Sequence, residues 1–127
     1  MIEAQLEKTC TEMLELDDWR SLKTDPVRNR EWGKGFGELG MADRLYIRYG
    51  WPSERFWGTA LVMWIEWKCM RPGRKTATKA QQHQLDWIAA ERARGALVLL
   101  AGVDFPATFE GFKAWYLNSG LNRRIAA

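Results

Sequence analysis

The sequence is poor in histidine and cysteine and has no long apolar run. His83 is the only histidine, which argues against catalysis by a histidine pair or triad. Cys10 and Cys69 lie far apart and fit no paired spacing, so we expect reduced thiols in a cytoplasmic protein rather than a zinc cluster or disulfides. No stretch is long enough to span a bilayer, and Glu3, Glu7 and Lys8 argue against a signal peptide. Hydrolytic chemistry in this chain would have to use carboxylates, lysine and a metal.

Its composition predicts one folded domain covering residues 1–127. Of the 127 residues, 46% are hydrophobic, which is enough for a core and argues against disorder. Eight tryptophans suit either core packing or base stacking. The net charge of +3 permits contact with a polyanion but does not require it.

The hydrophobic pattern predicts an α/β fold, a small mixed β-sheet flanked by helices. Helical spacing of apolar residues is found over about 2–16, 78–94 and 107–120, and strand patterns over about 42–48, 59–68 and 96–100. Residues 17–40 read as turns and loop. The strand, helix and strand after residue 59 predict a right-handed crossover with parallel pairing, in which 96–100 is a central strand. On the second helix Leu85, Ile88 and Ala89 are expected to be buried.

The strand over 59–68 ends in charged residues. Side chains alternate between the faces of a strand, so Glu66 and Lys68 are expected on one face and Ile65 and Trp67 on the other. One interpretation is a surface ion pair at a fraying strand end. The other is a metal site, in which the carboxylate holds a divalent cation and the lysine manages a water.

Three more acidic residues are candidates for the same site. Asp43 begins a strand on the face expected to carry Leu45 and Ile47, and it either caps a turn or points into a shared site. Glu3 and Glu7 lie together beside the apolar stripe of the first helix. They form either a solvated flank or a further contribution to the site.

Two basic segments are candidates for contact with a phosphate backbone. They contribute Arg28, Arg30 and Lys34 from one loop, and Arg71, Arg74 and Lys75 from a turn after residue 68. The first loop also contains Gly33-x-Gly35-x-Gly37. This run lacks the lysine and serine of a phosphate-binding loop and follows no evident strand, so we interpret it as a flexible or hairpin segment.

Taken in order, these features resemble a known family. The helix with Glu3, the Gly40-Met41-Ala42-Asp43 turn, the Glu66-Trp67-Lys68 triplet, and Gln84 ahead of Gly95 resemble the virus-type replication-repair nuclease (VRR-NUC) family. That family is a branch of the PD-(D/E)xK nucleases, which have a restriction-endonuclease-like core. Ala42 stands where the family usually has proline, which affects the geometry of the turn but removes no ligand.

The resemblance implies a set of site residues. Asp43 and Glu66 would bind Mg²⁺ or Mn²⁺ together with the Trp67 carbonyl. Glu3 would be the helical acidic residue, with Glu7 as the alternative. Lys68 would position or deprotonate a water, and Gln84 would orient the lysine or the substrate.

The function implied is metal-dependent hydrolysis of DNA phosphodiester bonds by an endonuclease. The family's stand-alone phage members suggest a homodimer acting on branched or flapped DNA in the bacterial or phage-infected host cytosol. Aromatic residues that could form the interface, or lie in the core, are Trp51, Phe56, Trp57 and Trp115. Two alternatives remain: a non-catalytic module that binds nucleic acid or a partner protein on the same fold, and a structural phage component.

Overall fold

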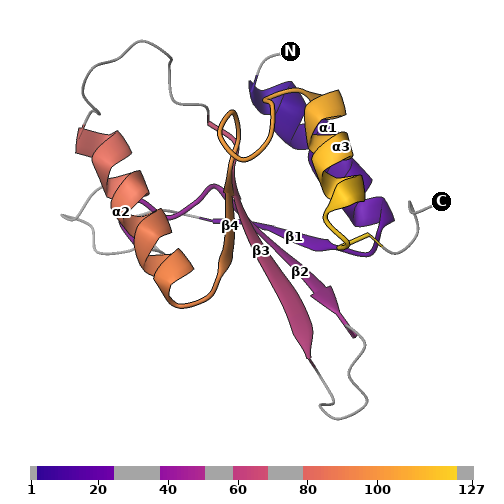
Figure 1. The fold of residues 1–127 in the computed structure, drawn as a ribbon, viewed down its shortest axis with the longest axis horizontal. Coiled ribbons are helices and arrows are strands. Elements are labelled where there is room, and N and C mark those ends of the chain that lie inside the picture. The colour runs from indigo at the N-terminus through magenta and orange to yellow at the C-terminus, as the bar shows by residue number, and fades with distance from the viewer. Residues whose placement is uncertain (1–2, 25–37, 51–58, 69–78, 123–127) are drawn as a thin grey trace.

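The computed structural model describes residues 3–24, 38–50, 59–68 and 79–122, which form three helices and one four-stranded mixed sheet (Figure 1). The elements are, in chain order, α1 (Glu3–Leu16), β1 (Arg20–Lys23), β2 (Arg44–Tyr49), β3 (Ala60–Glu66), α2 (Lys79–Ala93), β4 (Leu97–Leu100) and α3 (Phe109–Asn118). The sheet has the order β1-β2-β3-β4. The predicted α/β class and mixed sheet are confirmed.

The first three strands form an antiparallel meander. Arg44 of β2 pairs with Lys23 of β1 on one side and with Ile65 of β3 on the other. β1 lies within the segment predicted as turns and loop, so that prediction is wrong for Arg20–Lys23. A strand of four residues with one apolar side chain, Leu22, gives no detectable alternation.

The fourth strand pairs in parallel with β3, and α2 makes the connection between them, as predicted. α2 is followed by Gly95 with φ of +95°, the left-handed conformation expected of a helix stop. The expectation of a central strand is wrong, because β4 is last in the sheet order. It is apolar because it is covered on both faces: Leu99 belongs to the larger core cluster and Val98 to the smaller one.

Side chains close the outer edge of β4. The Arg92 guanidinium donates to the Val98 carbonyl at 2.7 and 3.2 Å. The Asp104 carboxylate accepts from the Leu100 amide at 2.7 Å and from Arg92 at 3.0 Å. These bonds occupy backbone groups that an exposed edge strand would otherwise offer to another chain.

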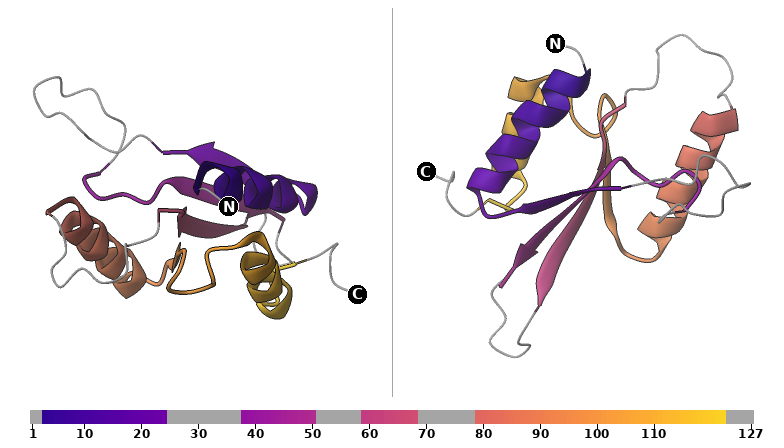
Figure 2. Two further views of the ribbon diagram at one scale, coloured as in Figure 1. Left: turned by 90° about the horizontal axis from the view of Figure 1, so that it is seen from above. Right: turned by 180° about the vertical axis from the view of Figure 1, so that it is seen from behind.

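Helices cover the two faces of the sheet unequally (Figure 2). α1 and α3 pack together on one face and enclose the larger core cluster, which includes Leu6, Tyr46, Met63, Ile65 and Phe112. α2 covers the other face with a smaller cluster of Ala42, Trp87, Ile88 and Val98. The structure therefore builds its main core under α1 and α3.

The apolar side of β2, which carries Leu45 and Ile47, is not its most buried side. On β2 the fully buried residues are Tyr46 and Arg48, while Leu45 and Ile47 are only half-buried. Burial of Tyr46 is tolerated because its hydroxyl bonds to Thr11 and to the Trp67 indole, at 2.8 and 2.9 Å.

On α2 the prediction was correct for Ile88. Trp87 is buried as well, whereas Leu85 is half-buried and Ala89 is exposed. The apolar spacing of α2 therefore predicted the buried face of the helix only to within one or two residue positions.

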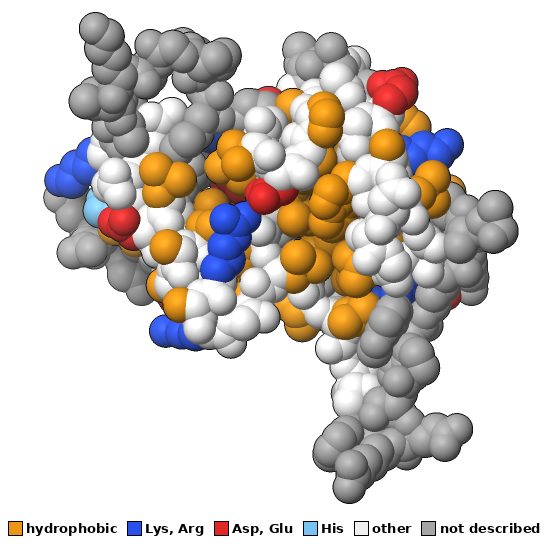
Figure 3. All heavy atoms as spheres, in the orientation of Figure 1, with side chains coloured by type: hydrophobic (Ala, Val, Ile, Leu, Met, Phe, Trp, Pro, Cys, Tyr) orange, Lys and Arg blue, Asp and Glu red, His pale blue; other side chains and the backbone are white. Residues whose placement is uncertain are grey.

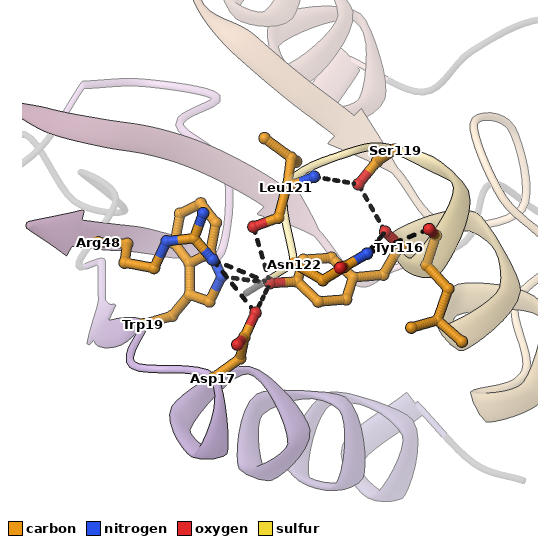
Figure 4. A network of polar contacts seen from close by, with 8 residues as sticks. Asp17, Trp19, Arg48, Tyr116, Ser119, Leu121 and Asn122 are labelled. Carbon is orange, nitrogen blue, oxygen red and sulfur yellow. Dashed lines mark hydrogen bonds and ion pairs between the residues drawn. The ribbon is translucent and has the colours of Figure 1, made fainter. Parts of the chain in front are cut away.

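A buried polar network joins α3 to the rest of the fold (Figure 4). Asp17 and Arg48 form an ion pair at 3.1 Å, and both side chains are completely buried. The Tyr116 hydroxyl donates to Asp17 and accepts from the Trp19 indole at 2.7 Å. The Arg48 guanidinium also lies 4.8 Å from the centre of the Trp19 ring. Four residues from three separate parts of the sequence thus depend on one another for their polar contacts.

The terminal helices agree with the predicted spacing. α1 buries Leu6, Cys10 and Met13, and α3 buries Phe112 and Tyr116. None of the helices in the described ranges has the length and apolar character needed to cross a bilayer.

Candidate active site at the end of the sheet

The end of the sheet brings together three residues from three strands. Because Arg44 pairs with Ile65, continuing the register by one residue sets Asp43 opposite Glu66. The Thr24 amide donates to the Asp43 carbonyl at 3.0 Å, which extends the β1–β2 ladder in the same way. Thr24, Asp43 and Glu66 therefore form one row across the sheet, although 23 positions separate the two acids along the chain.

Glu66 and Asp43 form a carboxyl pair in which Glu66 is fully buried. Burial, followed by the hydrogen bond to Asp43 and the negative charge of Asp43, raises the pKa of Glu66 to about 9. The Lys68 amide, 3.3 Å from Oε1, and the Lys68 charge act in the opposite direction. At neutral pH and without a cation, Glu66 therefore keeps its proton. The interpretation of a surface ion pair is wrong for this residue.

One oxygen of the pair lacks a donor. Glu66 Oε2 is buried and receives no hydrogen bond from an N–H or hydroxyl group in the described part of the chain. Two ionised carboxylates only accept hydrogen bonds, so either a shared proton or a cation must offset their repulsion. Hard carboxylate oxygens suit Mg²⁺ or Mn²⁺. The donor set of this pair therefore fits such a cation.

A cavity of about 200 Å³ lies beside the pair. Its walls are formed by Glu3, Ala4, Glu7, Lys23, Thr24, Asp43, Trp67 and Lys68. The helix and three strand ends thus converge on one polar space. Of the residues expected at the site, Glu3, its alternative Glu7, Asp43, Trp67 and Lys68 line this space. Glu66 does not line it but is hydrogen-bonded to Asp43, which does.

The two acidic residues of α1 differ in their surroundings. Glu7 bonds to the Arg44 guanidinium at 3.0 Å, and both side chains are 22% exposed. Glu3 is exposed at the start of α1 and lines the cavity. No cluster of three or more acidic, histidine or cysteine residues able to hold a metal occurs among the described residues. The site therefore presents a pair of carboxylates with Glu3 nearby.

Gln84 is not part of the cavity wall as described. It is half-buried on α2, and its backbone lies against the turn before Asp43. A Cβ added to Gly40 would come within 2.9 Å of the Gln84 nitrogen and 2.2 Å of the His83 carbonyl oxygen. The backbone of Gly40 thus packs against the backbone of His83 and Gln84, and this contact places the turn before Asp43.

Several residues singled out from the sequence lie outside the described part of the chain. These are the basic residues Arg28, Arg30, Lys34, Arg71, Arg74 and Lys75, the glycines Gly33, Gly35 and Gly37, the aromatic residues Trp51, Phe56 and Trp57, and Cys69.

Trp115, the fourth candidate for an interface, lies within the described part of the chain. It is half-buried and packs against Phe105 and Phe112. Apolar side chains gather beside and below α3 on the face shown in Figure 3.

Two residues of the cavity were missed from the sequence. Lys23 and Thr24 line it, and both were assigned to a loop. Only the pairing of β1 with β2 brings them beside Asp43. No local pattern in the sequence indicates that pairing.

Comparison with family models, curated proteins and solved structures finds no match for this chain. Its function must therefore be inferred from the chemistry of the site.

Proposed function

We propose that the protein is a metal-dependent DNA endonuclease of the PD-(D/E)xK type, similar to the VRR-NUC family. The observation that supports this most directly is the Asp43–Glu66 pair, in which the buried Glu66 has an oxygen that lacks a donor, next to a cavity lined by Asp43 and Lys68. A mixed sheet with helices on both faces is compatible with the restriction-endonuclease-like core.

Asp43 and Glu66, with the Trp67 carbonyl, would hold Mg²⁺ or Mn²⁺, and Glu3 would contribute directly or through a water. When bound, the cation would lower the pKa of a water and offset the charge of the phosphate. Glu66 must lose its proton for this to occur, so the cation takes the place of the proton in the pair. The ligand set is small, which leaves room for water and phosphate oxygens.

Lys68 is exposed and lines the cavity, so its ammonium can approach a water or a phosphate oxygen there. In the proposed reaction it orients the attacking water or stabilises the negative charge that develops on the phosphate. Gln84 would act from α2 by holding the turn that carries Asp43.

A non-catalytic module that binds nucleic acid or a partner protein is the second candidate. It is favoured by the lack of a three-ligand cluster in the described segments. Such a module would keep Glu66 protonated, and the carboxyl pair would have a structural role.

An assay of DNA cleavage separates the candidates. Supercoiled, linear and four-way-junction DNA are incubated with Mg²⁺, Mn²⁺ or EDTA. The nuclease proposal requires metal-dependent cutting that Lys68→Ala abolishes and Lys113→Ala, at an exposed lysine of α3, leaves unchanged. Binding without cutting supports the module, and neither activity supports a structural role.

Preference for branched or flapped DNA and a homodimeric state belong to the same proposal. The half-buried apolar residues near α3, including Trp115, are compatible with an interface. Light scattering of the purified protein tests the homodimeric state, and a monomer at all concentrations would overturn it.

A further inference from the structure

Thr24 is bonded to the backbone that presents Asp43. Its amide donates to the Asp43 carbonyl at 3.0 Å. Its hydroxyl lies 2.8 Å from the same carbonyl and 2.5 Å from the Ala42 carbonyl. Because a hydroxyl has one proton, this proton is shared between the two carbonyl oxygens. The end of β1 therefore holds the peptide before and after Asp43.

The opposite side of this turn is fixed by α2. Gly40 has φ of +81°, and its Cα approaches the His83 carbonyl so closely that a Cβ would lie 2.2 Å from the oxygen. Ala42 is buried in the cluster with Trp87 and Ile88. The segment from Gly40 to Asp43 is thus enclosed between α2 and Thr24.

This placement matters because Asp43 lies just before β2 begins, where the regular ladder is ending. Its carboxyl must nevertheless meet Glu66, which is fixed inside the core. A small rotation of the Ala42–Asp43 peptide would separate the two carboxyl groups. The bonds from Thr24 restrict that rotation.

We propose that Thr24 is a positioning residue that sets the Asp43 carboxyl against Glu66 by holding the Asp43 backbone from β1. The role deepens the proposed nuclease site and rests on it. Thr24 acts through Asp43 and need not touch the substrate.

The test compares Thr24→Val, which keeps the shape but removes the hydroxyl, with Thr24→Ser, which keeps the hydroxyl. Ser21→Ala removes another hydroxyl of β1 and serves as a control. Circular dichroism and thermal unfolding first establish that each variant is folded.

The first measurement needs no metal. Amide hydrogen exchange at position 24 reports the bond to the Asp43 carbonyl. We expect exchange about tenfold faster in Thr24→Val and unchanged in Thr24→Ser and Ser21→Ala. Equal exchange in all four proteins overturns the positioning role, whatever the activity of the wild type.

The second measurement is Mn²⁺ affinity by titration calorimetry. Loss of a residue that orients a ligand typically weakens metal affinity about 10- to 100-fold, so we expect this for Thr24→Val, with recovery in Thr24→Ser. The kcat for DNA cleavage should fall while the KM for DNA stays constant. A higher KM with unchanged Mn²⁺ affinity would mean that Thr24 binds substrate directly, which contradicts the proposal.

The two measurements separate this inference from the function on which it rests. If the wild type neither binds Mn²⁺ nor cuts DNA, the nuclease proposal fails. Accelerated exchange in Thr24→Val would then still support the placement of Asp43 by Thr24.

Discussion

Asp43 and Glu66 lie opposite each other at the ends of adjacent antiparallel strands, and the half-buried Asp43 carboxyl is hydrogen-bonded to the fully buried Glu66 carboxyl. The pairing follows from the register of β2 and β3, whereas the burial follows from the packing of the helices around the strand ends. Two ionised carboxylates in this position would repel each other, so Glu66 keeps its proton at neutral pH. A bound cation would offset the same repulsion once that proton is lost.

Replacing either acid by its amide should reduce metal binding without unfolding the protein. In Glu66→Gln the amide donates a hydrogen bond where the protonated acid did, and in Asp43→Asn one negative charge is removed. We expect Mn²⁺ affinity and cutting to fall at least tenfold in each variant, with equal or higher thermal stability.

Calorimetric titration and thermal unfolding measure both effects. Glu12→Gln, at an exposed position of α1, is the matched control. A variant of either acid that binds Mn²⁺ like the wild type would remove that residue from the ligand set.

The metal-free protein should lose stability as the pH rises. Glu66 has a folded pKa of about 9 and an ordinary value of 4.5. Between these pH values the unfolded chain releases the Glu66 proton while the folded chain keeps it. The contribution of this proton to the free energy of unfolding is therefore complete below pH 4.5 and is lost progressively up to about pH 9. The slope for one such group is at most about 1.4 kcal/mol per pH unit.

Urea unfolding from pH 5 to 9 in EDTA measures this slope, and Glu66→Gln should flatten it. Mn²⁺ at 100 times its Kd should restore about 2.7 kcal/mol where it binds. An identical pH profile for the wild type and Glu66→Gln would contradict the buried, protonated state of Glu66.

Much of the fold could be predicted from the sequence, because long amphipathic helices and apolar strands have strong periodic patterns. α1, α3, β3 and the parallel pairing of β4 were predicted in this way. β1 was not, since four residues with one apolar side chain lack a period and are held by pairing with β2.

The candidate site shows the same division. Asp43, Trp67 and Lys68, which were singled out from the sequence, line one cavity, while their roles stay a prediction. Thr24 and Lys23 could not be predicted, because their position depends on the register of β1. The buried charge of Arg48 was also missed, since its partners Asp17 and Tyr116 are distant in sequence.

The buried ion pair of Asp17 and Arg48 should be essential to stability. Asp17→Asn removes the charge that faces the Arg48 guanidinium in a site with no solvent exposure. Breaking such a pair from one side typically costs about 3–5 kcal/mol. Replacing both residues, as Asp17→Asn with Arg48→Met, should cost less than the sum of the two single changes, because no charge then remains buried.

Urea unfolding at pH 7 measures these free energies. The control is Glu91→Gln, which breaks the pair with Arg94 on the surface, where Arg94 is 72% exposed. That change should cost less than about 1 kcal/mol. Equal losses for the buried and surface pairs would contradict the role assigned to the network.

Gly40 and Gly120 allow backbone strain to be separated from steric conflict. Both have φ of +81°, so an alanine at either position pays the same left-handed strain, about 1–2 kcal/mol. A Cβ at Gly120 meets nothing within 4 Å, whereas at Gly40 it would lie 2.2 Å from the His83 carbonyl oxygen. Gly40→Ala should therefore be destabilised by more than Gly120→Ala, with the excess measured by urea unfolding.

Because the steric conflict pushes the turn away from α2, Gly40→Ala should also weaken Mn²⁺ binding at Asp43, while Gly120→Ala should leave it unchanged. Equal stability losses and equal affinities would show that the turn before Asp43 does not depend on its contact with α2.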